Sequence, residues 1–367
     1  MKISVPTETA PREQRVALAP DSVSRLMKSK IEVMVQRGAG LRAGFRDDAY
    51  AKAGATLVDA AAAFRGAALI AKVQPPSLDE IACIEEGGAL VCLLRPGQSV
   101  DMVAALAQRR ITALALELVP RITRAQSMDV LSSQSTVAGY KAVLIGASTL
   151  GKFLPMLTTA AGNVSPAKVF VIGAGVAGLQ AIATARRLGG VVSGFDVRPA
   201  AREQVLSLGA TFVANDLVSE SAETAGGYAR AQTSDEQART LAAIGNHIKD
   251  MDLVVTTAQI PGKAAPKLIT EEMIESMRAG SVIVDIAAES GGNCTLSRPG
   301  ESVESHDVTI VAPLNLPSTV AFHASQMFGR NIFELVKHLV ADGSLRLDPS
   351  DEITGAMMMT HEGEVLR

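Results

Sequence analysis

The stretch VFVIGAGVAGLQAIATARRLGGVVSGFDVR, residues 169–198, decides the fold of this chain. Its apolar start leads into the motif Gly173-x-Gly175-x-x-Gly178, which opens an alanine-rich helical segment, and a second apolar run ends in Asp196. This order is typical of a strand–helix–strand unit that holds the pyrophosphate of a dinucleotide at a helix N-terminus. A glycine-rich turn in an unrelated α/β protein and a flavin-binding version of the unit are the alternatives. Flavin enzymes usually carry the unit at the N-terminus, whereas here it begins only at Val169.

The glycines and the acid indicate the kind of nucleotide. Gly173 would make the tight turn, Gly175 would let the phosphates approach the backbone, and Gly178 would bring the helix close to the strand. Asp196 follows the glycines by roughly 20 residues, the spacing at which a carboxylate accepts hydrogen bonds from both hydroxyls of an adenosine ribose. Because a carboxylate there repels a 2′-phosphate, the pattern favours NAD(H) over NADP(H). Arg198 complicates this assignment, since an arginine nearby can hold a 2′-phosphate.

Composition limits the class of protein. The 367 residues are enough for two domains, and 47% hydrophobic but only 3% aromatic residues are typical of helices packed on a parallel sheet. A net charge of −3 offers no basic surface, so we expect no nucleic-acid partner. Cys83, Cys92 and Cys294 lack the spacing of metal ligands, so we expect reduced thiols and no metal site. The start MKISVPTETA lacks the apolar core of a secretory signal, and the longest charge-free apolar stretch, 169–185, is too short to span a bilayer.

The hydrophobic pattern predicts two Rossmann-like α/β domains, each with a doubly wound parallel sheet, flanking a nucleotide cleft. A helical connection over 132–161 would join them, with Gly139, Gly146 and Gly151 as candidate close-packing points. The amphipathic run 318–339 would return to the first domain. The expected boundaries are 1–131 with 308–350 for the first domain, 132–307 for the NAD(H)-binding domain, and 351–367 for a polar tail. The expected strands are Lys2–Val5, Glu32–Gln36, Ala67–Lys72, Ala89–Leu94, Thr112–Leu118, Lys168–Ile172, Val191–Phe195, Thr211–Val213, Leu253–Thr256, Val282–Asp285 and Val308–Val311.

A second polar group of residues follows the strand expected at 112–118. Residues 119–135 read VPRITRAQSMDVLSSQS and are dense in charged, amide and hydroxyl side chains. A solvated loop in which Asp129 or Ser132 caps the next helix would also explain them. Composition alone does not decide between a binding loop and a capped surface loop.

Residues 119–135 closely resemble the Arg-Gln-Asp loop of the NAD(H)-binding component of proton-translocating nicotinamide nucleotide transhydrogenase. The resemblance runs along essentially the whole chain, and the RAQSMD loop is its most specific part. Several other segments are shared with alanine dehydrogenases, which are related to this component. The matching segments are PTETAPREQRVALAP, RAQSMD, GAGVAGLQAIATARRLG, FDVRP, ETAGGYA, TTAQIPGKAAPKLIT and SVIVDIAAESGGNC.

The resemblance implies a role for each matching residue. Those implied for catalysis, at the nicotinamide end, are Arg121, Gln126, Asp129 and Ser132. Those implied to contact NAD(H) are Arg121, Ile122, Thr123, Gln126, Ser127, Met128 and Asp129 near the nicotinamide; Gly173, Ala174, Gly175, Val176 and Gly178 at the pyrophosphate; Asp196, Val197 and Arg198 at the adenosine ribose; Gly227 and Tyr228 on a mobile loop; and Thr257, Ala258 and Gln259 on the cleft floor. Relatives more often carry an apolar residue at the position of Gln259, a change that a backbone contact would tolerate.

An alanine dehydrogenase is the alternative that shares the fingerprint and much of the N-terminal sequence. Arg15 and Lys72 match the positions of that family's substrate-binding cations, although we favour inherited surface or interdomain ion pairing for them. Oxidation of an amino acid also needs a general acid/base at the substrate carbon. All five histidines follow residue 246, and VCLLRPG (91–97) stands where the relative has its catalytic histidine. Residues 289–292 read ESGG where the relative has an aspartate before Gly-Gly, so both groups are missing.

Transhydrogenation fits these absences, because hydride passes directly from C4 of NADH to C4 of NADP⁺ and no proton leaves a substrate. Positioning two nicotinamide rings and excluding water would carry catalysis. Only one fingerprint is present, so a partner domain or subunit must bind NADP(H), and membrane-spanning partner subunits must form the proton channel. The resemblance further implies a homodimer in the bacterial cytoplasm, held at the inner face of the plasma membrane by its partners. A catalytically retired nucleotide-binding module is a third interpretation, which the intact loop at 121–132 disfavours.

Overall fold

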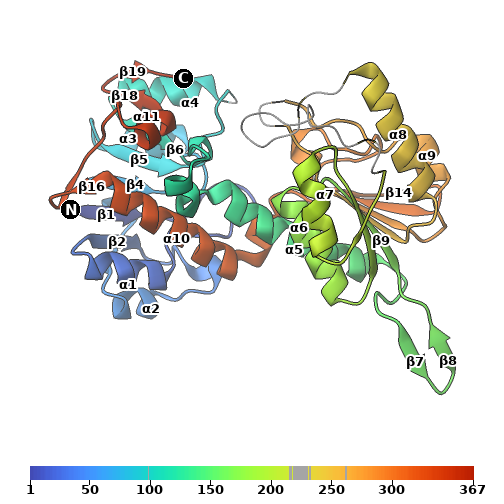
Figure 1. Ribbon diagram of the computed structural model, residues 1–367. Coiled ribbons are helices and arrows are strands. Elements are labelled where there is room, and N and C mark those ends of the chain that lie inside the picture. The colour runs from blue at the N-terminus through green and yellow to red at the C-terminus, as the bar shows by residue number, and fades with distance from the viewer. Residues whose placement is uncertain (98, 215–216, 218–229, 231–232, 261–262) are drawn as a thin grey trace. The chain divides into compact units, whose positions relative to one another are not determined.

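The structure, a computed structural model, describes residues 1–367 apart from 98, 215–216, 218–229, 231–232 and 261–262 (Figure 1). The chain forms two compact units. The first unit contains Met1–Gln134 and Pro317–Arg367, and the second contains Ser135–Leu316. The first unit is therefore discontinuous in sequence.

The first unit is built on a sheet that has eight strands among the described residues, in the order β19-β18-β6-β5-β4-β1-β2-β3. The six strands from β6 to β3 run parallel. A separate two-stranded ribbon, β16-β17, lies outside this sheet. The strands are β1 (Lys2–Val5), β2 (Glu32–Gln36), β3 (Thr56–Val58), β4 (Leu69–Ala71), β5 (Ala89–Cys92), β6 (Thr112–Ala115), β16 (Val340–Ala341), β17 (Ser344–Leu345), β18 (Met358–His361) and β19 (Glu364–Val365).

The helices of the first unit begin and end at local sequence signals. The helix α3 starts with a capping box, in which Ser77 Oγ accepts from the Glu80 N–H and the Glu80 carboxylate accepts from the Ser77 N–H. The long helix α10 buries an apolar stripe that includes Phe328 and Ile332. The helices are α1 (Pro20–Lys28), α2 (Asp47–Lys52), α3 (Leu78–Cys83), α4 (Val100–Gln108), α10 (Ala321–Leu339) and α11 (Glu352–Met357), with 3₁₀ turns η1 (Leu41–Ala43), η2 (Ala62–Phe64), η3 (Leu116–Leu118) and η4 (Thr123–Met128).

The residues expected as a polar tail, 351–367, instead contain the helix α11 and two strands of the first sheet, β18 and β19. β18 pairs antiparallel with β6, with Met358 opposite Leu114. The methionines of the run Met357–Met359 are buried, and Thr360 Oγ1 donates to the carbonyl oxygen of Ile111 at 2.7 Å. The expectation was wrong because a strand as short as β18 is enough to extend an existing sheet.

The second unit has a sheet of seven strands among its described residues, in the order β11-β10-β9-β12-β13-β15-β14. All its neighbours are parallel except β14 and β15. The strand at 308–311, expected in the first domain, pairs with β13 (Val282 opposite Thr309) and so belongs here. The strands are β9 (Lys168–Ile172), β10 (Val191–Phe195), β11 (Thr211–Phe212), β12 (Leu253–Thr256), β13 (Val282–Asp285), β14 (Ser302–Ser305) and β15 (Val308–Val311).

Two glycines of α5 (Val130–Thr149) allow the close packing that was expected. A Cβ on Gly139 would lie 2.0 Å from the carbonyl oxygen of Ala177, and one on Gly146 would lie 2.4 Å from Leu253 Cδ1. No described atom lies within 4 Å of the Cβ position of Gly151, so that expectation was wrong. The other helices of this unit are α6 (Val176–Arg187), α7 (Pro199–Ser207), α8 (Ser234–Ile248) and α9 (Glu271–Glu275), with the 3₁₀ turn η7 (Ala288–Ser290).

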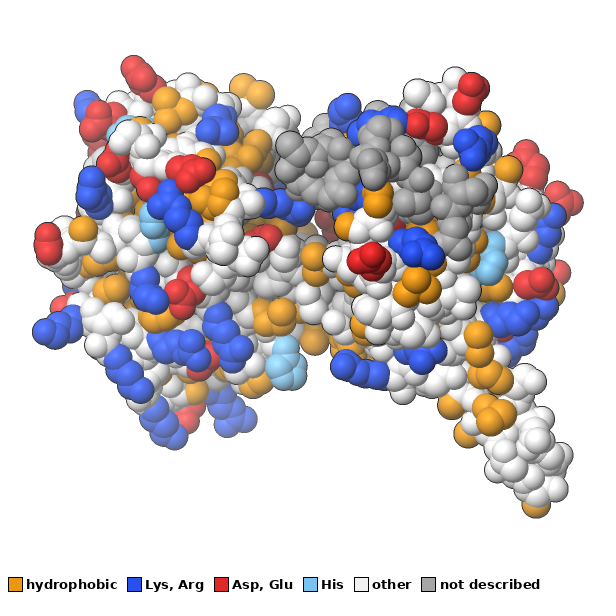
Figure 2. Space-filling view, viewed as in Figure 1, with side chains coloured by type: hydrophobic (Ala, Val, Ile, Leu, Met, Phe, Trp, Pro, Cys, Tyr) orange, Lys and Arg blue, Asp and Glu red, His pale blue; other side chains and the backbone are white. Residues whose placement is uncertain are grey.

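The helix expected over 132–161 is wrong beyond Thr149. There, β7 (Leu157–Thr159) and β8 (Gly162–Val164) form an antiparallel hairpin that projects from the second unit (Figure 1). Figure 2 shows hydrophobic side chains gathered where this hairpin leaves the unit. The exposed hydrophobic residues of this segment are Phe153, Met156 and Val164.

Alternate residues of the central strands face opposite hydrophobic cores in both units. In β4, Leu69 and Ile70 belong to different cores, and in β9, Val169 and Phe170 do so. A parallel sheet with an apolar core on each face is a doubly wound sheet, which confirms the expected fold class. Among the described residues, no helix is both long and apolar enough to cross a membrane.

Candidate nucleotide-binding site

The fingerprint lies at the carboxyl end of β9, where open parallel sheets bind their ligands. Gly173 follows the strand with a φ of +92°, and α6 begins at Val176 after the N-cap Gly175. Among the described residues, no side chain caps this helix N-terminus. The first N–H groups of α6 therefore rely on water or a ligand for their hydrogen bonds.

The three glycines differ in what a side chain would meet. A Cβ on Gly173 would lie 2.7 Å from Thr257 Oγ1, and one on Gly178 would lie 1.8 Å from the Gly173 carbonyl oxygen. The packing of the turn itself thus requires both glycines. Of the described atoms, a Cβ on Gly175 would meet only Arg198 Nη2, at 3.9 Å. The described residues do not require a glycine at this position, whereas a phosphate lying on the backbone would.

Asp196 joins the second strand of the unit to this turn. Its Oδ2 accepts hydrogen bonds from the Ala174 N–H at 2.7 Å and from Arg198 Nη2 at 2.8 Å. Its Oδ1 accepts from the backbone N–H and from Nε of Arg198, both at 2.9 Å. Buried Asp196 and partly exposed Arg198 therefore form a bidentate ion pair beside the glycine turn.

The residues expected on the cleft floor follow β12. Thr257 Oγ1 donates to the Gly173 carbonyl oxygen at 2.9 Å, which locks the turn to the neighbouring strand. The buried Asn293 holds both polar groups of Ala258: its Oδ1 accepts from the N–H at 3.0 Å and its Nδ2 donates to the carbonyl at 2.9 Å. Asn293 stands in no local motif that would mark it as a functional residue from the sequence. The Gln259 side chain is exposed.

The second group of expected residues lies in the first unit, on the loop between β6 and α5. Ala125 and Met128, within the 3₁₀ turn η4, are buried in the core of that unit. Arg121 and Gln126 are exposed on the same loop. Buried Ala125 and Met128 fix the loop to the core. The exposed polar side chains of the loop therefore present hydrogen-bonding groups from a fixed position.

Asp129 caps the helix that follows this loop. Its Oδ1 accepts from the Ser132 N–H at 2.9 Å, and its Oδ2 accepts from Ser132 Oγ at 2.6 Å. The capping interpretation that the sequence left open is therefore correct, and it accounts for both side chains structurally. Capping also holds the loop and the first turn of α5 in one conformation.

A residue far away in sequence fastens the loop from α10. Asn331 Nδ2 donates to the carbonyl oxygen of Ser127 at 2.7 Å, and Asn331 Oδ1 accepts from Ser133 Oγ at 2.7 Å. Arg124, in contrast, binds Glu352 at 3.0 Å on α11. Sequence analysis missed Asn331 because the contact spans 204 positions.

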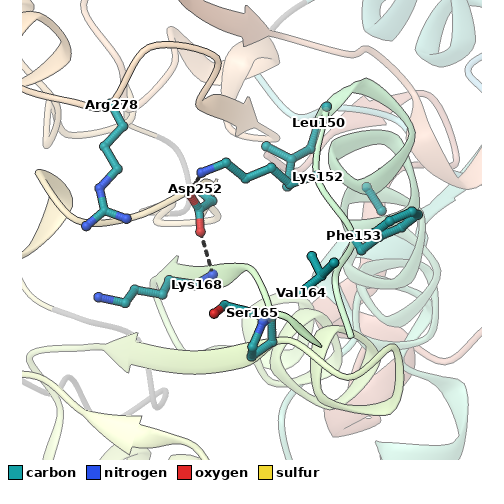
Figure 3. Close-up of a pocket in the computed structure, with 11 residues that line it drawn as sticks. Leu150, Lys152, Phe153, Val164, Ser165, Lys168, Asp252 and Arg278 are labelled. Carbon is teal, nitrogen blue, oxygen red and sulfur yellow. Dashed lines mark hydrogen bonds and ion pairs between the residues drawn. The ribbon is translucent and has the colours of Figure 1, made fainter. Parts of the chain in front are cut away.

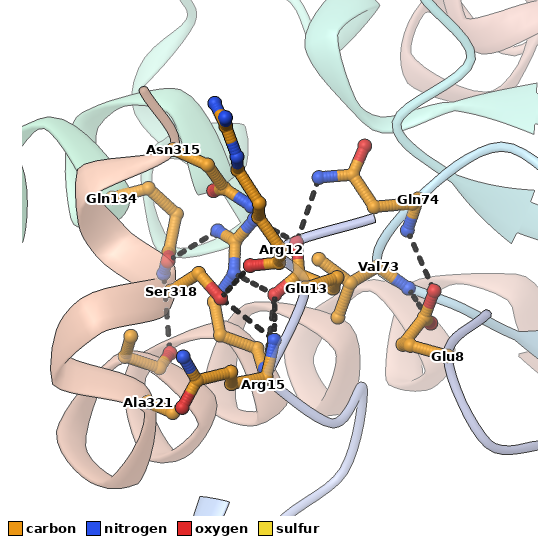
Figure 4. Close-up of polar contacts among 12 residues, drawn as sticks. Glu8, Arg12, Glu13, Arg15, Val73, Gln74, Gln134, Asn315, Ser318 and Ala321 are labelled. Carbon is orange, nitrogen blue, oxygen red and sulfur yellow. Dashed lines mark hydrogen bonds and ion pairs between the residues drawn. The ribbon is translucent and has the colours of Figure 1, made fainter. Parts of the chain in front are cut away.

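Arg15 is buried and ion-paired in the first unit, so the expected ion pairing is present but a surface position is wrong for it (Figure 4). Its Nε and Nη2 donate to the two carboxylate oxygens of Glu13 at 2.8 and 2.7 Å, and its Nη1 donates to Gln134 at 2.8 Å. Gln74 Nε2 also donates to Glu13, at 2.7 Å. Burial alone would raise the pKa of Glu13, but the Arg15 guanidinium lowers it to about 2. The cation of Arg15 is thus neutralised by its own unit.

Lys72 is buried and paired in the same way. Its Nζ lies 3.1 Å from Glu80 Oε1 and 3.5 Å from Glu8 Oε2. Burial would lower the pKa of Lys72, but the two carboxylates raise it above its usual value. Both cations that an amino-acid substrate would need are therefore bound to carboxylates of this chain.

A pocket of about 850 Å³ lies elsewhere in the second unit (Figure 3). Lys168 begins β9 and Asp252 directly precedes β12, so this pocket is at the amino ends of the strands, opposite the fingerprint. Asp252 accepts from Lys152 Nζ at 2.5 Å and from the Lys168 N–H at 2.8 Å. Burial would raise the pKa of Asp252, but these contacts lower it. None of the expected site residues lines this pocket.

The structure brings the expected residues together in two groups, one on each unit. Gly227 and Tyr228 lie outside the described residues. The group on the second unit is Gly173, Ala174, Gly175, Val176, Gly178, Asp196, Val197, Arg198, Thr257, Ala258 and Gln259. The group on the first unit is Arg121, Ile122, Thr123, Gln126, Ser127, Met128, Asp129 and Ser132.

Two family profiles match the chain: the alanine dehydrogenase/PNT N-terminal domain over residues 4–138 and the C-terminal domain over 142–367. The chain belongs to the alanine dehydrogenase/PNT family. Within this family, it is 42% identical to an NAD(P) transhydrogenase subunit alpha protein from Rickettsia prowazekii, over 100% of this chain and 96% of that protein. Identity to the corresponding protein from Rhodospirillum rubrum is 48%, over 100% of this chain and 98% of that protein.

Comparison of structures agrees with the sequence. A crystal structure of transhydrogenase from Sinorhizobium meliloti superposes with a TM-score of 0.91 at 43% identity, and each chain is covered completely. Alanine dehydrogenase from Halomonas elongata is more distant, at 31% identity over 100% of this chain and 94% of that protein. The expected resemblance to the transhydrogenase component is therefore confirmed.

Proposed function

We propose that this chain is the NAD(H)-binding component of a proton-translocating transhydrogenase and exchanges hydride with NADP(H) held by a partner. The observation that carries the proposal is the turn after β9, where Gly175 is open while Gly173 and Gly178 are required by packing. A pyrophosphate there would meet backbone N–H groups and the positive end of the α6 dipole. The residues present therefore fit a dinucleotide.

The loop of the first unit would orient the nicotinamide. When bound, that ring supplies or accepts the hydride. Arg121 and Gln126 would hold its carboxamide and ribose by hydrogen bonds, with Asp129 and Ser132 keeping the loop in place. None of these side chains needs to change protonation, because their contribution is to align the ring for direct transfer. The buried anchors of the loop supply the rigidity that such alignment requires.

Oxidation of alanine is the second candidate function, and Arg15 and Lys72 are the residues that favour it. Both already bind buried carboxylates. A carboxylate substrate would have to displace Glu13 from Arg15 and leave its charge buried without a partner, which costs roughly 3–5 kcal/mol. With no histidine before residue 247, a general acid/base of that type is also missing from the first unit's N-terminal segment. Hydride exchange between nucleotides is therefore the better explanation.

The proposal includes partners. Similarity to an alpha subunit of a transhydrogenase supports a complex in which another domain or subunit binds NADP(H) and membrane-spanning subunits form the proton channel. It also includes a homodimer, in the bacterial cytoplasm and held at the inner face of the plasma membrane by those subunits. Coupling to the proton gradient would arise from conformational changes in the partners, which shift their affinity for nucleotide.

The direct test mixes this chain with the NADP(H)-binding component of a related transhydrogenase and follows hydride transfer by stopped-flow absorbance. We expect transfer only in the mixture, and we expect NADH to bind more tightly than NADPH. Gln126→Asn should slow transfer with little loss of NADH affinity, whereas the exposed Gln237→Asn is the matched control. Bound NADH without transfer would contradict the proposal. With alanine and NAD⁺ alone, the chain should produce no NADH, and robust production would favour the second candidate.

A further inference from the structure

Arg15 begins a series of hydrogen bonds that crosses the first unit to the loop between β6 and α5. Its Nε and Nη2 donate to Glu13, and its Nη1 donates to Gln134 Oε1 at 2.8 Å (Figure 4). All three side chains are buried. Buried polar groups depend on the protein for their hydrogen bonds, so each of these contacts restricts the position of its partner.

Gln134 connects Arg15 to Ser133. A guanidinium can only donate, so the amide oxygen of Gln134 must face it, and the amide nitrogen is left to donate elsewhere. This Nε2 donates to Ser133 Oγ and to the Ala324 carbonyl oxygen, each at 3.2 Å. Ser133 Oγ in turn donates to Asn331 Oδ1 at 2.7 Å, the nearer of its two acceptors among the described residues.

The series ends at the backbone carbonyl of Ser127, to which Asn331 Nδ2 donates at 2.7 Å. A carbonyl oxygen can only accept, so this end fixes the same direction of donation as the guanidinium does. Hydrogen bonds aligned in one direction polarise and strengthen one another. The side chains of Arg15, Gln134, Ser133 and Asn331, with the Ser127 carbonyl, are named the Arg15 network below.

The carbonyl at the end of the Arg15 network belongs to the loop that we propose to orient the nicotinamide. Ser127 directly follows Gln126, whose amide would hold the ring. Asp129 fixes the loop to the first turn of α5, whereas the network fixes it to α10. Groups that align a reacting ring need to be held within about 0.5 Å, so loss of the network would misplace Gln126.

We infer that Arg15 is a positioning residue for hydride transfer, which acts on the nicotinamide loop through Gln134, Ser133 and Asn331. Arginine suits this role because its charge is permanent and its planar fork is rigid. Two of its nitrogens are held by Glu13, so the third is aimed at Gln134. The inference rests on the proposed function and gives a role to a cation that resembles a substrate-binding group in the sequence.

The test measures hydride transfer by stopped-flow absorbance, with the full chain mixed with the NADP(H)-binding component of a related transhydrogenase. Arg15→Lys keeps the charge beside Glu13 but removes the fork, and Asn331→Leu breaks the last hydrogen bond. We expect each variant to transfer hydride about 3- to 10-fold more slowly, as the loss of one hydrogen bond allows. Affinity for 5′-AMP, which reaches only the adenosine end of the site, should not change. Arg65→Lys, at an exposed arginine of the same unit, is the matched control and should transfer at the natural rate.

The double variant Arg15→Lys/Asn331→Leu distinguishes a network from two independent defects. If both residues act through one network, the double variant should be about as slow as the slower single variant, because either substitution already interrupts it. Ser133→Ala removes the connecting hydroxyl, so in that background the effects of the two substitutions should multiply instead. If Arg15→Lys does not fold, Gln134→Met replaces it, with the same expectations.

An unchanged transfer rate in Arg15→Lys would overturn the inference while the proposed function stands. Effects that multiply in the natural background, or that still fail to multiply in the Ser133→Ala background, would do the same. Failure of the natural chain to transfer hydride in the mixture would instead overturn the proposed function itself.

Discussion

Replacement of Gly175 by alanine is expected to weaken NADH binding strongly without lowering the stability of the protein. The backbone there has φ −75° and ψ −168°, which alanine adopts without strain. Within the part of the chain that the structure describes, the new methyl group would meet only Arg198 Nη2, at 3.9 Å. The free energy of unfolding should therefore change by less than about 0.5 kcal/mol, or rise by about 0.4–1 kcal/mol because alanine has less freedom in the unfolded chain.

Binding of NADH should respond very differently to Gly175→Ala. The methyl group would fill the space through which a phosphate approaches the N–H groups at the start of α6. Loss of two charge-assisted hydrogen bonds, each worth about 1.5–3 kcal/mol, weakens binding by about 3–6 kcal/mol. This corresponds to at least a ~100-fold increase in Kd, since each step of about 1.4 kcal/mol is a factor of ten.

Gly178→Ala is the contrasting variant, with the same change of one methyl group. Its Cβ would lie 1.8 Å from the Gly173 carbonyl oxygen, so the helix or the turn must move. Overpacking of this kind costs about 1–3 kcal/mol or more. Thermal unfolding with and without NADH, together with calorimetric titration, compares the two variants. The reasoning would be refuted if Gly175→Ala bound NADH as the natural chain does, or if it unfolded at the temperature of Gly178→Ala.

The remaining predictions concern the first unit. The pKa of Glu13 is lowered from 4.5 to about 2. Its contribution to the free energy of unfolding is therefore complete above pH 4.5 and should be lost as the pH falls towards 2. A stability that does not change with pH over this range would contradict the prediction. Arg15→Met should lower the free energy of unfolding by about 3–5 kcal/mol, measured by urea denaturation, because Glu13 loses its buried partner. Asn331→Leu should slow hydride transfer in the reconstituted mixture but leave 5′-AMP affinity intact, since the side-chain hydrogen bonds of Asn331 with described residues go to the loop and to the first turn of α5. A changed 5′-AMP affinity would argue against that assignment.

Much of the fold could be predicted because its central strands are short apolar runs that neighbouring glycines and polar residues delimit. The expected strands at 168–172, 191–195, 253–256 and 282–285 have the observed bounds. Of the segments that were missed, β3 and β14 lie at sheet edges, β18 lies next to the edge strand β19, and the β7–β8 hairpin lies outside the main sheets. Edge strands carry weaker hydrophobic patterns, because one side of the strand needs no apolar partner.

The nucleotide turn could likewise be read from local sequence. Everything from Gly173 to Asp196 lies in one short stretch of chain, and the contacts that fix it are made mostly inside a single strand–helix–strand unit. Asn293 and Asn331 could not be found this way, because each holds a backbone segment to which only folding brings it.

Residue types and spacing thus specify the glycine turn, because the geometry that it must adopt follows from neighbours in the chain. The state of the charged groups depended on the folded conformation, even where the partners are only two residues apart, as in Glu13–Arg15 and Asp196–Arg198. Arg15 and Lys72 resemble substrate cations in the sequence, yet burial places carboxylates against both. Asp196 reads as an open acceptor, yet Arg198 occupies it. A charged side chain can bind a ligand only if no residue of its own chain already pairs with it. Which residues lie within about 3–4 Å of it is a property of the folded chain.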